Sequence, residues 1–170
     1  MFCNNICGVN TSQYGFKKHS GCTHSLFTVD ETVKYFTKTG SKVYCSFFDA
    51  SKAFDKVLHN GIFKKLLDTG IPVSFVQLLR YWYSNLQCRV KWNNVLGDIF
   101  PVLCGVRQAG VLSPVLFELY IDSVLSELKL SGHGVHTGSL FIACVLYADD
   151  IVLLSASCHG LQQLINICNV

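Results

Sequence analysis

Three aspartates stand where the sequence predicts the ends of buried strands. Asp49 closes the apolar run 43–48, and Asp149 and Asp150 lie between two apolar runs about a hundred residues later. Neighbouring side chains of a regular strand point to opposite faces, so an Asp-Asp pair inside one would force a charge into the core. A turn at Tyr147-Ala148-Asp149-Asp150 avoids that cost, and we expect it at the tip of a β-hairpin.

Carboxylates on two strands of one sheet would repel one another if those strands lie side by side. A divalent cation relieves the repulsion, and carboxylate oxygens without nearby His or Cys favour Mg²⁺ or Mn²⁺ over zinc. Two such ions, roughly 3.5 to 4 Å apart, serve phosphoryl transfer by holding the attacking and leaving oxygens in line. For any one aspartate the alternative is the commoner role of capping a helix or a turn.

The helices that must support these aspartates follow from the spacing of apolar residues. A stretch with helical spacing precedes the run that ends at Asp49, and two more follow it. Of the two stretches that follow Asp49, one ends at Thr69-Gly70 and the other begins at Pro72. We expect helices at residues 22–38, 59–68, 72–83 and 113–129, and a last one near the C-terminus that includes residues 161–168.

Two hairpins complete the expected fold. Residues 86–92 and 98–102 flank a turn-rich connector at 93–97, and residues 140–146 and 151–154 flank the Asp-Asp turn. The resulting order of elements, βαα, ββ, α, ββ, α, predicts an α+β fold in which helices back a sheet.

Composition places limits on the class of protein. Half of the 170 residues are apolar and only 15% are charged. This apolar fraction is high for an isolated domain of this size, in which roughly 30% of the surface of the unfolded chain stays exposed after folding. We therefore expect one folding unit with missing partners or flanks, cut within or just after its last helix. The net charge of +3 permits nucleic-acid binding without indicating it.

Nine cysteines lie scattered in apolar surroundings, and no secretory leader is visible. This pattern indicates a reduced, intracellular protein, in the nucleus or the cytoplasm, and not a disulfide scaffold. The apolar runs are shorter than the ~20 residues of a membrane-spanning helix, so no membrane association is expected. A zinc module from Cys3, Cys7, His19 and Cys22 is an alternative, but its spacing lacks tight Cys-x-x-Cys knuckles.

Four motifs occur in one order along the chain. They are Gln13-Tyr14-Gly15-Phe16-Lys17-Lys18-His19-Ser20, Phe47-Phe48-Asp49-Ala50-Ser51-Lys52-Ala53-Phe54-Asp55, Gly105-Val106-Arg107-Gln108-Ala109-Gly110-Val111-Leu112-Ser113-Pro114 and Tyr147-Ala148-Asp149-Asp150. This ordered set resembles the reverse transcriptase domain of non-long-terminal-repeat retrotransposons, the LINE-like elements. The resemblance runs from about residue 11 onward.

The resemblance implies a right-hand polymerase fold, with an antiparallel palm sheet backed by helices, part of the fingers and no thumb. Residues 1–170 would form a single partial domain, with a fingers remnant at about 11–40 and a palm with inserted helices at 41–170. The implied activity is RNA-directed DNA synthesis, in which two Mg²⁺ or Mn²⁺ ions assist nucleotidyl transfer. The implied partners are an RNA template, a DNA primer, deoxynucleotides, and the thumb and flanking domains of a parent polypeptide.

The same resemblance assigns roles around the aspartates. Asp49 and Asp149 are implied as the principal metal ligands and Asp150 as the third carboxylate. The carbonyl of Ala50 would be a further ligand. The backbone amides of Lys52 and Ala53 would face the phosphates of the incoming nucleotide, because an oxyanion needs such donors.

Five further positions bear on nucleotide and template binding. Phe54 matches the family's steric gate, a bulky residue that excludes a ribose 2′-hydroxyl. Without the resemblance, the simpler interpretation is a phenylalanine that packs in the core. Lys17 and Lys18 are implied contacts of triphosphate or template, and a Lys pair is otherwise a solvated surface. Gln108 would position nucleotide and template. The family's glycine after it is Ala109 here, which costs about 1 kcal/mol or more if that position needs positive φ.

Two readings compete with an active reverse transcriptase. Phosphate contacts supply most non-specific affinity for nucleic acid, so without a thumb we expect the isolated chain to show little or no processive synthesis. It could instead be a non-catalytic relic or an interaction module. An RNA-dependent RNA polymerase would share the carboxylate turn, but Phe54 and its Ser-Lys-Ala-Phe-Asp context argue against it.

Overall fold

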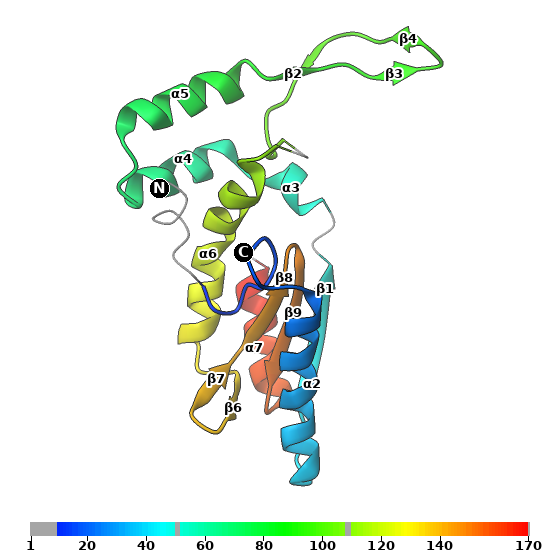
Figure 1. Ribbon diagram of the computed structural model, residues 1–170, viewed down its shortest axis with the longest axis vertical. Coiled ribbons are helices and arrows are strands. Elements are labelled where there is room, and N and C mark those ends of the chain that lie inside the picture. Colours follow the sequence, from blue (N-terminus) through cyan, green and yellow to red (C-terminus); the bar gives the residue numbers. More distant parts are fainter. Residues whose placement is uncertain (1–9, 50–51, 108–109, 170) are drawn as a thin grey trace. The chain divides into compact units, whose positions relative to one another are not determined.

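A three-stranded antiparallel sheet, in the order β1-β9-β8, carries the aspartates. In this computed structural model β1 spans Tyr44–Asp49, β8 spans Cys144–Tyr147 and β9 spans Asp150–Ser155. β9 is the central strand, and the register places Asp49 directly opposite Asp150. Strands that are far apart in the sequence therefore lie side by side (Figure 1).

The structure describes residues 10–49, 52–107 and 110–169. Their contacts group them into two units. The hairpin unit holds the described residues of Lys52–Tyr120, and the sheet unit holds those of Gly8–Ser51 and Ile121–Val170. Helix α6 (Ser113–Leu130) runs through the division at Tyr120. The expected single partial domain, divided near residue 40, stays a prediction.

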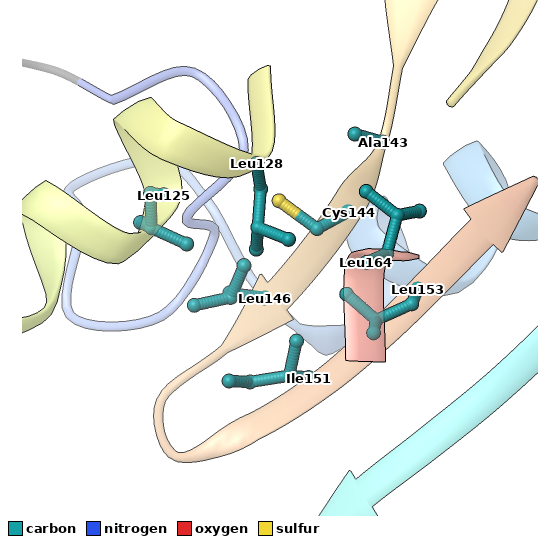
Figure 2. Packing of buried hydrophobic residues seen from close by; sticks show 8 residues of the cluster. All are labelled: Leu125, Leu128, Ala143, Cys144, Leu146, Ile151, Leu153 and Leu164. Carbon is teal, nitrogen blue, oxygen red and sulfur yellow. The ribbon is translucent and has the colours of Figure 1, made fainter. Parts of the chain in front are cut away.

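Apolar side chains cover both faces of the sheet, which explains why its central strand is an unbroken apolar run. Ile151 and Leu153 belong to one core cluster, with Leu125 of α6 and Leu164 of α7 (Cys158–Cys168) (Figure 2). Val152 and Leu154 alternate to the other face and join a second cluster. Because both faces are buried, β9 needs no alternation of apolar and polar residues.

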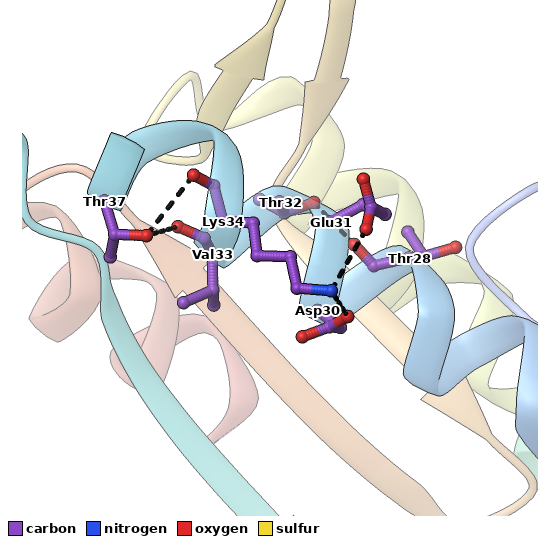
Figure 3. A network of polar contacts seen from close by, with 7 residues as sticks. All are labelled: Thr28, Asp30, Glu31, Thr32, Val33, Lys34 and Thr37. Atoms are coloured by element: carbon purple, nitrogen blue, oxygen red, sulfur yellow. Dashed lines mark hydrogen bonds and ion pairs between the residues drawn. The ribbon is translucent and has the colours of Figure 1, made fainter. Parts of the chain in front are cut away.

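Helix α2 (Cys22–Lys38) packs on that second face through Val29 and Phe36. Its exposed side carries charged residues beside the apolar side chains of Leu26 and Phe27. There the Lys34 Nζ lies 2.5 Å from Asp30 Oδ2 and 3.4 Å from Glu31 Oε1 (Figure 3). Exposed pairs of this kind add little to stability, so apolar contacts with the sheet hold the helix in place.

The apolar run 140–146 does not form one arm of a hairpin, as the sequence predicted. Its first residues form β7 (Leu140–Ile142), which pairs with β6 (Val135–Thr137) in a separate hairpin (Figure 1). After a bend at Ala143, only β8 pairs with β9. The prediction was wrong because Ile142 and Cys144 are buried on either side of the bend, so the apolar sequence carries no sign that the pairing strand changes.

The hairpin unit begins with three helices, and its short strands follow. The helices are α3 (Ala53–Lys56), α4 (His59–Asp68) and α5 (Val73–Ser84). Strand β2 (Gln87–Cys88) pairs with β5 (Phe100–Pro101), and β3 (Lys91–Trp92) pairs with β4 (Val95–Leu96).

The expected connector 93–97 is shorter than predicted. Asn93 and Asn94 form a two-residue turn with φ of 45° and 62°, which suits the twist of a hairpin, and the next two residues already belong to β4. β4 is only two residues long and stands between Asn94 and Gly97, so the sequence pattern did not separate it from the turn.

Most of the predicted elements are confirmed. Helices occupy Cys22–Lys38 and His59–Asp68 as expected. The helix predicted at 72–83 begins and ends one residue later, and the helix predicted at 113–129 ends one residue later. The α+β class, with helices backing an antiparallel sheet, is confirmed. In the described part of the chain no helix is both long and apolar enough to cross a membrane. The cysteines at described positions are all free thiols.

The buried thiol of Cys144 makes the fold sensitive to alkaline pH. Burial raises its pKa from 9.0 to about 11, against a weaker lowering by the Ser12 hydroxyl. Below pH 9 the folded and unfolded chains both keep this proton. Between about pH 9 and pH 11 the unfolded chain loses it first, so the free energy of unfolding falls as pH rises, by up to about 3 kcal/mol.

We expect Cys144→Ala to flatten this alkaline loss of stability, measured by urea unfolding at pH 8 to pH 11. Burial also raises the pKa of Cys45 and Cys168, so part of the slope remains. Cys158→Ala, at an exposed position, serves as the control. An unchanged slope in Cys144→Ala would contradict the assignment.

Candidate active site

Asp49 and Asp150 form a cross-strand pair at the end of the sheet. They are directly opposite in the antiparallel register, on the face that α2 covers, and both are exposed. The Cβ atoms of such pairs are typically about 4.5 to 5.5 Å apart, and like charges there are destabilising. Neither aspartate forms an ion pair with a described residue. The structure therefore brings together two carboxylates whose repulsion no described side chain relieves.

Asp149 lies in the turn that joins β8 to β9. Tyr147 and Asp150 are paired across the hairpin, so Ala148 and Asp149 form a two-residue loop. Ala148 has φ of 57°, a left-handed conformation that costs a residue with a Cβ about 1 to 2 kcal/mol. The structure thus places Asp150 opposite Asp49 and Asp149 next to it, and which of the two ligates more directly stays a prediction.

The paired carboxylates suit a hard divalent cation. Asp49 and Asp150 offer only oxygen donors, and a cation would offset their mutual repulsion. Within residues 10–49, 52–107 and 110–169, however, no cluster of three or more His, Cys, Asp or Glu side chains is arranged to hold a metal. The donor chemistry fits at the pair, and the part of Asp149 in a three-carboxylate set stays a prediction.

A pocket of about 420 Å³ lies beside this pair within the sheet unit. Asp49 and Asp150 line it together with Tyr147 and with the Leu26 and Val29 side chains of α2. One part of its wall is therefore acidic and the rest largely apolar. The carboxylates border open space that a small molecule or a nucleic-acid end could enter.

Sequence reasoning missed the residues that support the turn. The Gln13 side chain is buried and bonds both the backbone N–H and the backbone carbonyl of Ala148. At Gly15 an added Cβ would lie 2.3 Å from the Ala148 nitrogen, so only glycine fits there. Both belong to the motif at 13–20, whose order and type suggested a family but gave no sign of a contact 135 positions away.

Lys17 and Lys18, the implied contacts of triphosphate or template, follow Gln13 and Gly15 in the same motif but differ in their surroundings. Lys17 Nζ donates to the Asn10 carbonyl at 2.5 Å, and the Lys18 side chain is exposed. Phe16 and His19, on either side, both have positive φ. Their part in binding triphosphate or template stays a prediction.

Phe54, the expected steric gate, lies in the hairpin unit on the short helix α3. Its ring stacks on Phe117 of α6, with centroids 4.7 Å apart and planes at 22°. The stacking fixes one side of the ring, and the residue is half-buried. Lys52 and Ala53 stand at the start of α3, where the first N–H groups of a helix lack partners within it.

Two other predicted positions, Ala50 and Gln108, lie outside the described residues, as does Ala109. The chain just before Gln108 is firmly held within the hairpin unit. The Val106 N–H donates to the Phe54 carbonyl at 2.7 Å, and the Gly105 N–H donates to the Val57 carbonyl at 2.8 Å. Gly105 has φ of 91°, and a Cβ there would lie 2.9 Å from the backbone of Asp55. The Phe54 segment and the loop before Gln108 are therefore joined by backbone bonds.

Two aromatic residues add to this anchoring. Burial raises the pKa of the Tyr83 phenol, and the nearby Arg107 backbone lowers it by less. The His59 Nε2 lies 2.8 Å from the Gly105 carbonyl, and its ring packs on the Tyr83 ring. Neither residue carries a recognisable motif, so the sequence gave no sign of this role.

Comparison with known proteins agrees with the geometry. Residues 3–170 match the family model described as reverse transcriptase (RNA-dependent DNA polymerase). The chain is 31% identical over 154 residues to the Pol polyprotein of type-2 retrotransposable element R2DM from Drosophila melanogaster, covering 91% of this chain and 14% of that protein. It is 30% identical over 138 residues to a probable RNA-directed DNA polymerase from transposon X-element of the same species, covering 79% and 15%.

Solved structures show the same fold at low sequence identity. A telomerase from Candida albicans, in a complex with a fragment of telomeric RNA, aligns over 99% of this chain and 31% of that one, with a TM-score of 0.68 at 13% identity. An apo telomerase from Candida tropicalis aligns over 99% and 35%, with a TM-score of 0.66 at 13% identity. The chain spans about one seventh of the R2DM and X-element proteins. It belongs to the reverse transcriptase (RNA-dependent DNA polymerase) family.

Proposed function

We propose that this chain forms the catalytic part of a longer RNA-directed DNA polymerase of a LINE-like element. The observation that carries the proposal is the register of β1 and β9, which sets Asp49 opposite Asp150 at the open end of the sheet. The family match over residues 3–170 supports the reaction class. The reaction joins the 3′-hydroxyl of a primer to the α-phosphate of a deoxynucleotide and releases pyrophosphate.

The residues proposed to hold Mg²⁺ or Mn²⁺, as two ions, are Asp49, Asp149 and Asp150. When bound, such ions stabilise the charge that develops on the attacking and leaving oxygens. The chain's own contribution is to keep two carboxylates fixed on neighbouring strands, so that little reorganisation is needed when substrate arrives. The Ala50 carbonyl is proposed as a further oxygen ligand.

Nucleotide selection is assigned to the hairpin unit. We propose that the N–H groups of Lys52 and Ala53 contact the triphosphate and that the Phe54 ring blocks a ribose 2′-hydroxyl. Stacking on Phe117 supports the second role, because a gate must resist displacement by the sugar. Gln108, Lys17 and Lys18 are proposed contacts of nucleotide or template.

The proposed partners are an RNA template, a DNA primer and the rest of the parent polypeptide. The telomerase of similar fold is solved with an RNA fragment, which supports the first. Exposed apolar side chains support the last: Trp92 on the hairpin is 76% exposed, and Leu103 is 80% exposed. Scattered exposed apolar residues are ordinary, but a whole ribbon of them marks an interaction surface.

Primer extension tests the proposal. The matching segment of the R2DM polyprotein is replaced by this chain, and incorporation of deoxynucleotides and ribonucleotides is measured on an RNA template with Mg²⁺. We expect DNA synthesis, and we expect Phe54→Ala to raise ribonucleotide incorporation relative to deoxynucleotide about 10- to 100-fold, the effect of losing about 1 to 3 kcal/mol of discrimination.

The matched control is Phe63→Leu, a change of a buried phenylalanine on α4 that faces no proposed substrate. Unchanged sugar discrimination in Phe54→Ala would remove the gate role and leave a core phenylalanine. If the exchanged polymerase folds but makes no DNA, and Ala109→Gly does not restore synthesis, a non-catalytic relic or interaction module becomes the better reading.

A further inference from the structure

The segment that precedes α2 runs along the edge strand of the sheet. The Tyr14 N–H donates to the Leu146 carbonyl at 2.9 Å, and the Leu146 N–H donates to the Ser12 carbonyl at 2.8 Å. These bonds make a single parallel bridge between Gln13 and Leu146. The segment is therefore fixed to β8 one residue before the turn motif begins.

From this position the Gln13 side chain reaches the turn. Its Oε1 accepts the Ala148 N–H at 3.2 Å and the Gly15 N–H at 2.8 Å, and its Nε2 donates to the Ala148 carbonyl at 3.1 Å. The residue is only 4% exposed. One buried amide thus satisfies both backbone groups of Ala148, and no other uncharged side chain of that length offers a donor and an acceptor at its end.

Ala148 is the residue of the turn that needs support. Its φ of 57° is unfavourable for a residue with a Cβ, and such conformations persist where surrounding contacts fix them. Asp149 and Asp150 follow directly. The orientation of the Ala148 backbone therefore sets the direction in which these two carboxylates leave the turn.

We propose that Gln13 is a positioning residue for the carboxylates, clamping the Ala148 backbone so that Asp149 and Asp150 keep a fixed orientation relative to Asp49. The proposal rests on the proposed function, in which these aspartates hold a divalent cation. Partners that orient metal ligands typically change metal affinity 10- to 100-fold when they are removed. Gln13 contacts neither metal nor substrate in this role and acts only through the turn.

Two variants of Gln13 divide its contacts. Gln13→Met keeps the length of the side chain and loses both donor and acceptor, while Gln13→Glu keeps an acceptor and loses the donor to the Ala148 carbonyl. The matched control is Gln162→Glu, the same chemical change on the exposed side of α7, where the amide donates to the Asn166 side chain. A third variant, Gly15→Ala, pushes the segment off the turn by sterics alone.

The 170-residue chain is studied with two measurements. Hydrogen exchange of the Ala148 amide is followed by NMR, and Mn²⁺ binding is titrated by electron paramagnetic resonance. For Gln13→Met we expect exchange at Ala148 to speed up at least about 10-fold and Mn²⁺ affinity to fall about 10-fold or more. Gln13→Glu should lower the affinity with less effect on exchange, and Gln162→Glu should change neither.

The outcomes separate this proposal from the one on which it rests. No Mn²⁺ binding by the unsubstituted chain would overturn the proposed metal site, while faster exchange in Gln13→Met would still support the clamp. Normal Mn²⁺ affinity in a folded Gln13→Met would show a merely structural glutamine and overturn the inference. If Gln13→Met does not fold, the Mn²⁺ affinity of Gln13→Glu decides instead: a lower affinity supports the inference, and an unchanged affinity overturns it.

Discussion

Replacing Asp49 with asparagine is expected to abolish DNA synthesis by a polymerase that carries this segment. A metal clamp supplies several kcal/mol of transition-state stabilisation, and each 1.4 kcal/mol is a factor of ten, so we expect a loss of about a thousandfold or more in kcat. Asp150→Asn should act similarly, because it removes the other half of the cross-strand pair. Single-turnover primer extension with Mg²⁺ measures the loss.

The same substitution should have the opposite effect on the metal-free fold. Removing one of two directly opposed like charges relieves a repulsion of up to about 1 kcal/mol, so the unfolding midpoint without metal should rise. Mg²⁺ should raise the midpoint of the unsubstituted chain and leave that of Asp49→Asn unchanged. Asp68→Asn, at the exposed end of α4, is the control. An Asp49→Asn chain that still responds to Mg²⁺ would contradict the assignment.

Shortening Leu153 to alanine is expected to be the most damaging change to the fold. The side chain is fully buried in the middle of β9, within the cluster of Figure 2. Leu→Ala at such a site loses the transfer free energy of the removed atoms and leaves a cavity, together about 3 kcal/mol. For a chain of this size that lowers the unfolding temperature by roughly 10 °C.

Circular dichroism during heating and urea unfolding would measure this effect. Leu130→Ala is the matched control, because Leu130 at the end of α6 is 87% exposed and should change stability by less than about 0.5 kcal/mol. A loss below about 1 kcal/mol at Leu153 would mean that the sheet unit does not pack as described.

The sequence was sufficient where one local pattern decides a structure. Helix α4 carries its own apolar spacing and its own stop at Thr69-Gly70, so its bounds were predictable. The turn before β9 was predictable because two adjacent charges cannot both lie inside a buried strand, and the structure places Asp149 in the loop and Asp150 at the first position of β9. The helix and strand before Asp49 were likewise confirmed, since both are encoded by residues next to one another.

Contacts between distant residues were not predictable from these patterns. Gln13 reaches a turn 135 positions away, and nothing in a polar stretch distinguishes a clamping glutamine from a solvated one. The division of residues 140–146 between two hairpins was not predictable for a similar reason. An apolar residue in the sequence does not indicate which strand its own strand pairs with. The position of Asp150 opposite Asp49 depends on how β1 and β9 are aligned, and the sequence of neither strand alone specifies that alignment.

The strand order β1-β9-β8 also has a consequence for synthesis on the ribosome. β1 is synthesised about a hundred residues before its neighbour β9. At roughly 5 to 20 residues per second, β1 waits on the order of ten seconds for its partner. During that time the Phe47 and Phe48 side chains and the unpaired edge of β1 are open to pairing with other nascent chains.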